Sequence, residues 1–119
     1  MKKCLVIGAA GQIGTELVSA LRSKRGIDNV IAADLRVDNL SSPFYELDVT
    51  NESALLDLVV SEGVTEVYHL VAILSATGEK APKTAWELNM KTLLNVLDLA
   101  KEGIIQRVFW PSSIAVFGP

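Results

Sequence analysis

The chain has little of several features that mark other classes of protein. It contains one cysteine, Cys4, so no disulfide can form within it. It has no basic run, and its net charge is −3 at pH 7, which argues against nucleic acid or an anionic membrane as a partner. No apolar stretch approaches the length needed to cross a bilayer. Because no leader segment precedes the first apolar run either, we expect a soluble, cytoplasmic protein.

What the sequence does contain is many apolar residues, arranged so that segments with the pattern of strands alternate with segments with the pattern of helices. Half of the 119 residues are hydrophobic, which suits one domain over residues 1–119 with a real core. Runs typical of buried parallel strands alternate with segments of helical periodicity. Strands are expected at residues 2–7, 30–34, 44–47, 65–72 and 107–110. Helices are expected at 15–25, at 83–101 and, between them, from a cap at Thr50 or Asn51 to a stop at Gly63. The last helix is expected to be well buried, because its apolar residues leave no clean polar face.

Strands that alternate with helices imply a parallel sheet with right-handed crossovers. The sequence therefore predicts an α/β fold, a Rossmann-type parallel sheet with strand order 3-2-1-4-5 and helices on both faces. Open sheets of this kind bind their ligands where the strands end at their carboxyl side. The glycine-containing turn at residues 8–14, Asp34, Asp48 and the serines at 112–113 all fall at that edge.

The glycines that follow the first strand are spaced as in a dinucleotide-binding turn. Gly8 allows a tight bend, Gly11 allows the backbone to approach a pyrophosphate, and Gly14 allows the next helix to pack closely on the strand. The N–H groups that open this helix near Gln12 then face the phosphate charge. A purely structural strand-to-helix turn is the alternative interpretation.

An acidic residue at the end of the second strand strengthens the nucleotide interpretation. Asp34 lies about twenty positions beyond the last glycine, where a carboxylate accepts hydrogen bonds from the hydroxyls of the adenosine ribose. Because a carboxylate there would repel a 2′-phosphate, NAD is favoured over NADP. Arg36 weakens this preference, since an arginine beside the position could bind a phosphate.

Four segments together resemble a known family. Residues 8–14 (GAAGQIG), 47–49 (LDV), 69–79 (HLVAILSATGE) and 111–119 (PSSIAVFGP) resemble extended short-chain dehydrogenases/reductases, the superfamily of NAD-dependent epimerases and dehydratases. Within it, the loop at 73–79 and the segment at 112–119 are most similar to the short-chain type of L-threonine 3-dehydrogenase. The resemblance covers the whole chain and implies an NAD-dependent oxidoreductase that converts L-threonine to 2-amino-3-ketobutyrate.

The resemblance also implies the residues that bind NAD. Asp48 has an alternative role, because the same side chain could merely help to cap the following helix, for which Thr50 and Asn51 are the other candidates. The implied positions are Gly8, Gly11, Gln12, Ile13 and Gly14 at the pyrophosphate; Asp34 and Leu35 at the adenosine ribose; Asp48 and Val49 beside the adenine; Leu70, Val71, Ala72 and Leu74 along the nicotinamide side; and Asn89, which orients that region, with Ser112.

Ser113 is the candidate for chemistry. By the resemblance, this serine hydrogen-bonds the substrate hydroxyl that loses its proton, and Ser112 is the near alternative. Two adjacent serines after a strand could also bond only local backbone. The resemblance implies that a substrate pocket is bordered by Ser75, Thr77 and Gly78. No metal site is expected, and the lone histidine, His69, is interpreted as structural.

The family's Tyr-x-x-x-Lys pair, in which a tyrosine takes the hydroxyl proton, is not in this sequence. Tyr45 and Tyr68 are followed four positions later by Val49 and Ala72. We therefore expect a C-terminally truncated, NAD-binding part of a longer enzyme, without its substrate lobe, that binds NAD weakly or not at all and does not turn over. A nucleotide-sugar epimerase or dehydratase and a non-enzymatic NAD-binding module are the alternatives. A homodimer through the helix at 83–101 is also expected from the resemblance, and apolar surface left unpaired by truncation is the other possible cause of association.

Overall fold

The computed structural model describes residues 2–36, 40–70 and 82–110, and of residues 82–86, 88 and 89 only the backbone. The described elements follow the predicted order with small shifts at their ends. They are β1 (Lys3–Ile7), α1 (Gln12–Arg25), the 3-10 turn η1 (Ile27–Asn29), β2 (Val30–Asp34), β3 (Phe44–Glu46), α2 (Glu52–Glu62), β4 (Val64–His69), α4 (Pro82–Lys101) and β5 (Arg107–Phe109). The turn η1 is the element that the sequence pattern did not predict.

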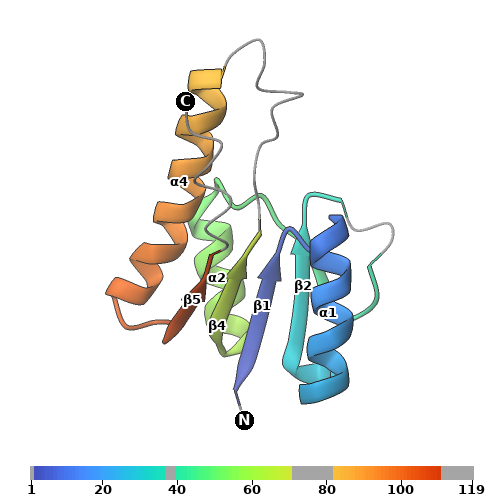
Figure 1. Cartoon of the computed structure of the whole chain (residues 1–119). Coiled ribbons are helices and arrows are strands. Elements are labelled where there is room, and N and C mark those ends of the chain that lie inside the picture. Colours follow the sequence, from blue (N-terminus) through green and yellow to red (C-terminus); the bar gives the residue numbers. More distant parts are fainter. Residues whose placement is uncertain (1, 37–39, 71–81, 111–119) are drawn as a thin grey trace.

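The strands form one sheet in the order β3-β2-β1-β4-β5, and every neighbouring pair is parallel. This confirms the predicted strand order. Figure 1 shows α1 in front of β1 and β2, with α2 and α4 behind the sheet. A core of buried side chains lies on each side, one formed with α1 and a larger one formed with α2 and α4. Helices therefore cover both faces, as predicted, and the parallel strands are shielded from water on both sides.

The helix α2 shows how local sequence sets the element boundaries. The side chain of Asn51 accepts a hydrogen bond from the backbone N–H of Ala54, so Asn51 rather than Thr50 is the N-cap. The helix ends at Gly63, which adopts the left-handed conformation with φ of 69°. In between, Leu55 and Val59 are each 1% exposed and face the sheet.

The expectation of a well-buried helix at residues 83–101 is wrong for the described side chains of α4. Leu94 is 50% exposed and Leu97 is 40% exposed, while Leu93 and Val96 lie in the core. Only one face of a helix, made of positions three and four residues apart, can pack on the sheet. Apolar residues that are spread around the whole helix therefore include some that face solvent. Polar residues take buried positions instead, since Thr92 and Asn95 are 2% and 5% exposed.

The last turn of α1 is joined to the sheet by charge. Arg25 forms an ion pair and hydrogen bond with Glu66 of β4, whose side chain is 3% exposed. This hydrogen bond raises the pKa of Arg25. Cys4 lies beside the pair and is fully buried, and burial raises the pKa of its thiol. The buried carboxylate thus has a cation as partner, which is the condition for keeping a charge inside a protein.

No helix in the described part of the chain is long and apolar enough to span a membrane. Within the same residues, no group of three or more His, Cys, Asp and Glu side chains is arranged to hold a metal ion.

Candidate functional site

The turn between β1 and α1 is built from glycine backbone. Gly8 has φ of 87°, a conformation that other residues rarely adopt, and its N–H donates to the carbonyl of Ala33 at 2.9 Å. The turn closes when the N–H of Gly11 donates to the Gly8 carbonyl at 3.2 Å. As predicted, α1 begins at Gln12, directly after this turn.

Gly14 and Gly11 are glycines for different reasons. A Cβ on Gly14 would lie 2.2 Å from the carbonyl oxygen of Gly8, so only glycine lets α1 approach β1 this closely. A Cβ on Gly11 would meet only the same oxygen, at 3.5 Å, which is ordinary contact. Gly11 is exposed, with φ of −72°. The fold therefore requires Gly14, whereas the open space at Gly11 is the space that a closely approaching phosphate needs.

The start of α1 is prepared for an anion. The first N–H groups of any helix lack an intrahelical partner, and here Gly11 offers no side-chain cap. The first turn of α1 contains no acidic residue. The positive end of the helix dipole and these N–H groups thus point to the space beside Gly11, where they would stabilise a negative charge.

Asp34 is joined directly to the glycine turn. Its Oδ2 accepts a hydrogen bond from the backbone N–H of Ala10 at 2.9 Å, and its Oδ1 accepts one from the N–H of Leu35 at 2.6 Å. Each carboxylate oxygen has further lone pairs, so the ribose hydroxyls could still donate to it. The role of Ala10 was missed from the sequence, because a backbone donor leaves no signal in the residue type.

Two apolar side chains are exposed at this edge. Ile13 is 68% exposed and Leu35 is 61% exposed, although both belong to the predicted NAD site. The unfavourable exposure of these apolar side chains to water is removed when they cover the apolar faces of a bound nucleotide.

Asp48 and Val49 follow β3 and differ in their surroundings. Asp48 is exposed, and its Oδ1 accepts hydrogen bonds from the hydroxyl of Thr50 at 2.6 Å and from the Thr50 N–H at 3.0 Å. The bond from the Thr50 hydroxyl is the main reason why the pKa of Asp48 is lowered. Val49 is 5% exposed and belongs to the core beside α2 and α4. Of the two residues, Asp48 is therefore the one whose side chain is available to a ligand.

His69 ends β4 and is buried, at 1% exposure. Its Nε2 lies 3.4 Å from the hydroxyl oxygen of Thr92 in α4, and no described residue forms a hydrogen bond with its Nδ1. Burial lowers its pKa to about 4, so the ring is neutral near pH 7. The next residue, Leu70, donates its N–H to the carbonyl of Ile7 at 2.9 Å, which extends the β4–β1 pairing toward the glycine turn. A buried neutral histidine agrees with the structural role expected for it.

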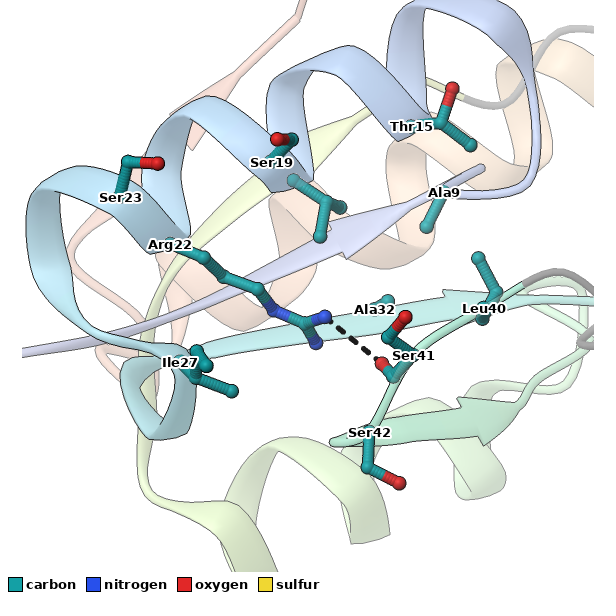
Figure 2. A pocket seen from close by; sticks show the side chains of 11 residues that line it. Ala9, Thr15, Ser19, Arg22, Ser23, Ile27, Ala32, Leu40, Ser41 and Ser42 are labelled. Atoms are coloured by element: carbon teal, nitrogen blue, oxygen red, sulfur yellow. Dashed lines mark hydrogen bonds between the residues drawn. The ribbon is translucent and has the colours of Figure 1, made fainter.

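A separate cavity of about 470 Å³ lies between α1 and the segment at residues 40–42 that leads into β3. Figure 2 shows Thr15, Ser19 and Ser23 on one side of it, with Arg22 pointing across to Ser41. The Arg22 guanidinium donates to three backbone carbonyls, those of Val30, Ser41 and Pro43, at 2.7 to 3.2 Å. The charge of Arg22 is therefore committed to joining α1 to the chain that enters β3. Only Ala9 and Thr15 of the glycine-turn region border this cavity, so it is distinct from the cofactor edge.

The remaining predicted site residues lie outside what the structure describes. For Asn89 only the backbone, within α4, is described. The others are Val71, Ala72, Leu74, Ser75, Thr77, Gly78, Ser112 and Ser113.

The fold and the site define a class of protein. A parallel sheet in this strand order carries a glycine turn, a free helix start and an acidic residue at the end of β2, and these features fit a bound dinucleotide. The chain belongs to the NAD dependent epimerase/dehydratase family, whose sequence profile matches residues 4–119. The cofactor of the family is NAD, and Asp34 together with the open space at Gly11 is suited to it.

Solved structures give more detail on the likeness. The chain is 48% identical to a GalE-like L-threonine dehydrogenase from Cupriavidus necator, with a TM-score of 0.86 over 92% of this chain and 36% of that one. It is 41% identical to L-threonine dehydrogenase from Clostridium difficile, with a TM-score of 0.83 over 93% and 36%. A UDP-glucose 4-epimerase has a TM-score of 0.79 at 22% identity, which shows only that the fold is shared.

Curated relatives have less specific names. An uncharacterized epimerase/dehydratase of Staphylococcus saprophyticus is 48% identical over 124 residues, which cover 100% of this chain and 38% of the relative. The chain thus spans somewhat more than a third of the length of the curated relatives it matches.

Proposed function

We propose that this chain is the NAD-binding part of an oxidoreductase that converts L-threonine to 2-amino-3-ketobutyrate. The observation that carries the cofactor half of this proposal is the hydrogen bond from Ala10 to Asp34, because it fixes a carboxylate beside the start of α1. The similarity to L-threonine dehydrogenases at 41% and 48% identity supports the substrate. When bound, NAD supplies the acceptor for a hydride from the substrate carbon.

In this proposal the residues of the cofactor edge have separate tasks. The N–H groups at the start of α1 bind the pyrophosphate beside Gly11, and Asp34 accepts hydrogen bonds from the adenosine ribose. Asp48 borders the adenine. Ser113 holds the substrate hydroxyl, with Ser112 as the alternative, and the tyrosine that takes the proton belongs to a part of the enzyme that this sequence does not include. A group that accepts a proton during hydride loss is required by the chemistry.

The cofactor half is tested on the full-length protein by titration with NAD and NADP, because the 119-residue chain alone is expected to bind NAD weakly or not at all. We expect NAD to bind at least about tenfold more tightly, because Asp34 repels a 2′-phosphate. The variant Asp34→Asn should reduce this preference, while Asp28→Asn, which removes a carboxylate from η1 on the same chain, should leave it unchanged. Equal affinities of the unchanged protein for the two cofactors would contradict the proposal.

The substrate half is tested on the full-length protein with L-threonine and, in parallel, with UDP-glucose. NADH formation with L-threonine supports the proposal. Epimerisation of the sugar nucleotide would instead support the alternative suggested by the names of the curated relatives. Tight NAD binding without turnover of either compound would point to a non-enzymatic module.

We further propose a homodimer that involves α4. Leu94 and Leu97 leave apolar surface on the outer side of this helix, 50% and 40% exposed respectively. Exposed apolar side chains grouped on one helix are common at interfaces between subunits. Sedimentation of Leu94→Glu/Leu97→Glu should show monomers where the original chain forms dimers. An unchanged sedimentation coefficient would contradict an interface on α4.

A further inference from the structure

The helix α4 lies behind the sheet, yet it contacts the cofactor edge through two buried polar side chains. Asn95 donates from Nδ2 to the carbonyl oxygen of Val49 at 3.0 Å, across 46 positions of sequence. One turn earlier, the Thr92 hydroxyl lies 3.4 Å from His69. Positions three apart share one face of a helix, so both contacts come from the side that faces the sheet.

These contacts reach the loop that follows β3 and the last residue of β4. Val49 directly follows Asp48, beside the proposed adenine position, and His69 directly precedes Leu70, at the proposed nicotinamide side. All of Val49, Thr92 and Asn95 are at most 5% exposed. A buried hydrogen bond is costly to lose, because the group left behind has no water to replace the partner.

We infer that Asn95 is a positioning residue for the adenine end of the NAD site. It contacts no cofactor atom itself and acts by holding the Val49 carbonyl, which fixes the course of the chain from Asp48 to the start of α2. This inference rests on the proposed place of Asp48 at the adenine. Within that short stretch, the N–H of Asn51 donates to the Asp48 carbonyl at 2.9 Å and the N–H of Thr50 donates to the Asp48 side chain. The stretch is thus held together by its own hydrogen bonds, and Asn95 adds a hydrogen bond to α4 beside the packing of the Val49 side chain in the core.

The test separates positioning from general stability by using two ligands. AMP requires the adenine position, whereas inorganic pyrophosphate requires only the glycine turn and the start of α1. Asn95→Leu keeps the approximate volume of the side chain and removes the donor, and Asn95→Ala serves as a second variant. Val96→Ala, at the next position of the same helix and fully buried, is the matched control for lost packing.

In the full-length protein, we expect Asn95→Leu to bind AMP about fivefold more weakly than the unchanged protein, with pyrophosphate affinity unaltered. Val96→Ala should keep the original ratio of the two affinities. Hydrogen exchange provides a second measurement that needs no ligand, since the amides of Thr50 and Asn51 should exchange faster in the Asn95 variants than in Val96→Ala. The inference is overturned if AMP and pyrophosphate lose affinity equally, or if exchange at these two amides does not respond. Neither result would bear on threonine as the substrate.

Discussion

The helices α1 and α4 lie on opposite faces of the sheet and are held against it in opposite ways. At its start, α1 touches β1 because Gly14 has no side chain, and the Gly8 carbonyl occupies the space where one would be. By contrast, α4 carries buried polar side chains, and Asn95 reaches a backbone carbonyl beside the cofactor edge. The difference follows from what each helix must do. At α1, helix N–H groups bind a phosphate, so the helix backbone must lie close to the glycine turn. At α4, side chains reach out to hold a neighbouring loop.

The largest expected effect is at the start of α1. In Gly14→Ala, the new Cβ would meet backbone atoms of Gly8 and Ala9 at 2.2 and 2.8 Å, which no side-chain rotation can relieve. We expect a loss of about 4 kcal/mol or more in the free energy of unfolding, measured by urea denaturation. An unfolding midpoint close to that of the original chain would show that α1 can move away from β1. Close backbone packing would then not distinguish α1 from α4.

The C-terminal end of α1 provides the next test. There a side chain joins the helix to the sheet, whereas at Gly14 the lack of a side chain allows the contact. Arg25→Met leaves the Glu66 carboxylate, 3% exposed, without its cation. We expect about 3 kcal/mol of destabilisation in the same measurement. Lys24→Met removes a neighbouring charge that has no ion pair with Glu66 and should change stability by less than about 0.5 kcal/mol.

A double variant checks the cause. Arg25→Met/Glu66→Met should recover much of the lost stability, because two apolar side chains replace a buried charge pair without leaving a charge behind. If the double variant is no more stable than Arg25→Met, packing rather than charge explains the loss.

On the α4 side, His69 predicts a pH dependence. The unfolded chain binds a proton at this ring with a pKa of 6.5, whereas the folded chain does so only at about 4. Between these values the unfolded state holds more protons, so stability falls as the pH falls, by about 1.4 kcal/mol per pH unit. Well above pH 6.5, where the ring is neutral in both states, this group no longer affects stability. Because His69 is the one histidine of the chain, the difference between the original chain and His69→Gln isolates the effect. Parallel stability curves for the two proteins would contradict the burial of a neutral ring.

The smallest expected effect on folding is at Gly11. Gly11→Ala should change the free energy of unfolding by less than about 0.5 kcal/mol, since the new methyl group would have 3.5 Å to its nearest neighbour. The NAD affinity of the full-length protein, measured by titration, should nevertheless fall at least about tenfold, because the methyl group occupies the space for the pyrophosphate. Retained affinity would mean that Gly11 is as dispensable for the ligand as it is for the fold.

Much of the fold could be predicted from the sequence because its signals are local. The apolar run before Gly8, the cap at Asn51 and the glycine at 63 each set an element end through neighbouring residues. The burial of α4 could not be predicted in the same way. Leu94 and Leu97 are as apolar as Leu93, and only the rotation of the helix on the sheet decides which of them faces solvent.

The candidate site divides along the same line. The glycine spacing and Asp34 could be recognised, because the ligand imposes them on residue type and position. The Ala10 N–H that holds Asp34 could not, since every residue except proline has that donor. Thr92 and Asn95 did leave a signal, as polar residues three apart in an apolar stretch of helix, but nothing local indicates that their partners are His69 and Val49.

The sequence by itself determined the alternation of strands and helices, the strand order and the glycine turn, because periodicity and backbone freedom are properties of short segments. Only the tertiary structure decided which glycine the fold requires, what holds Asp34 and how α4 reaches the cofactor edge. The requirement for Gly14 depends on how α1 packs back on Gly8 and Ala9. The other two depend on contacts between residues 24 and 46 positions apart, which are set when the helices pack on the sheet.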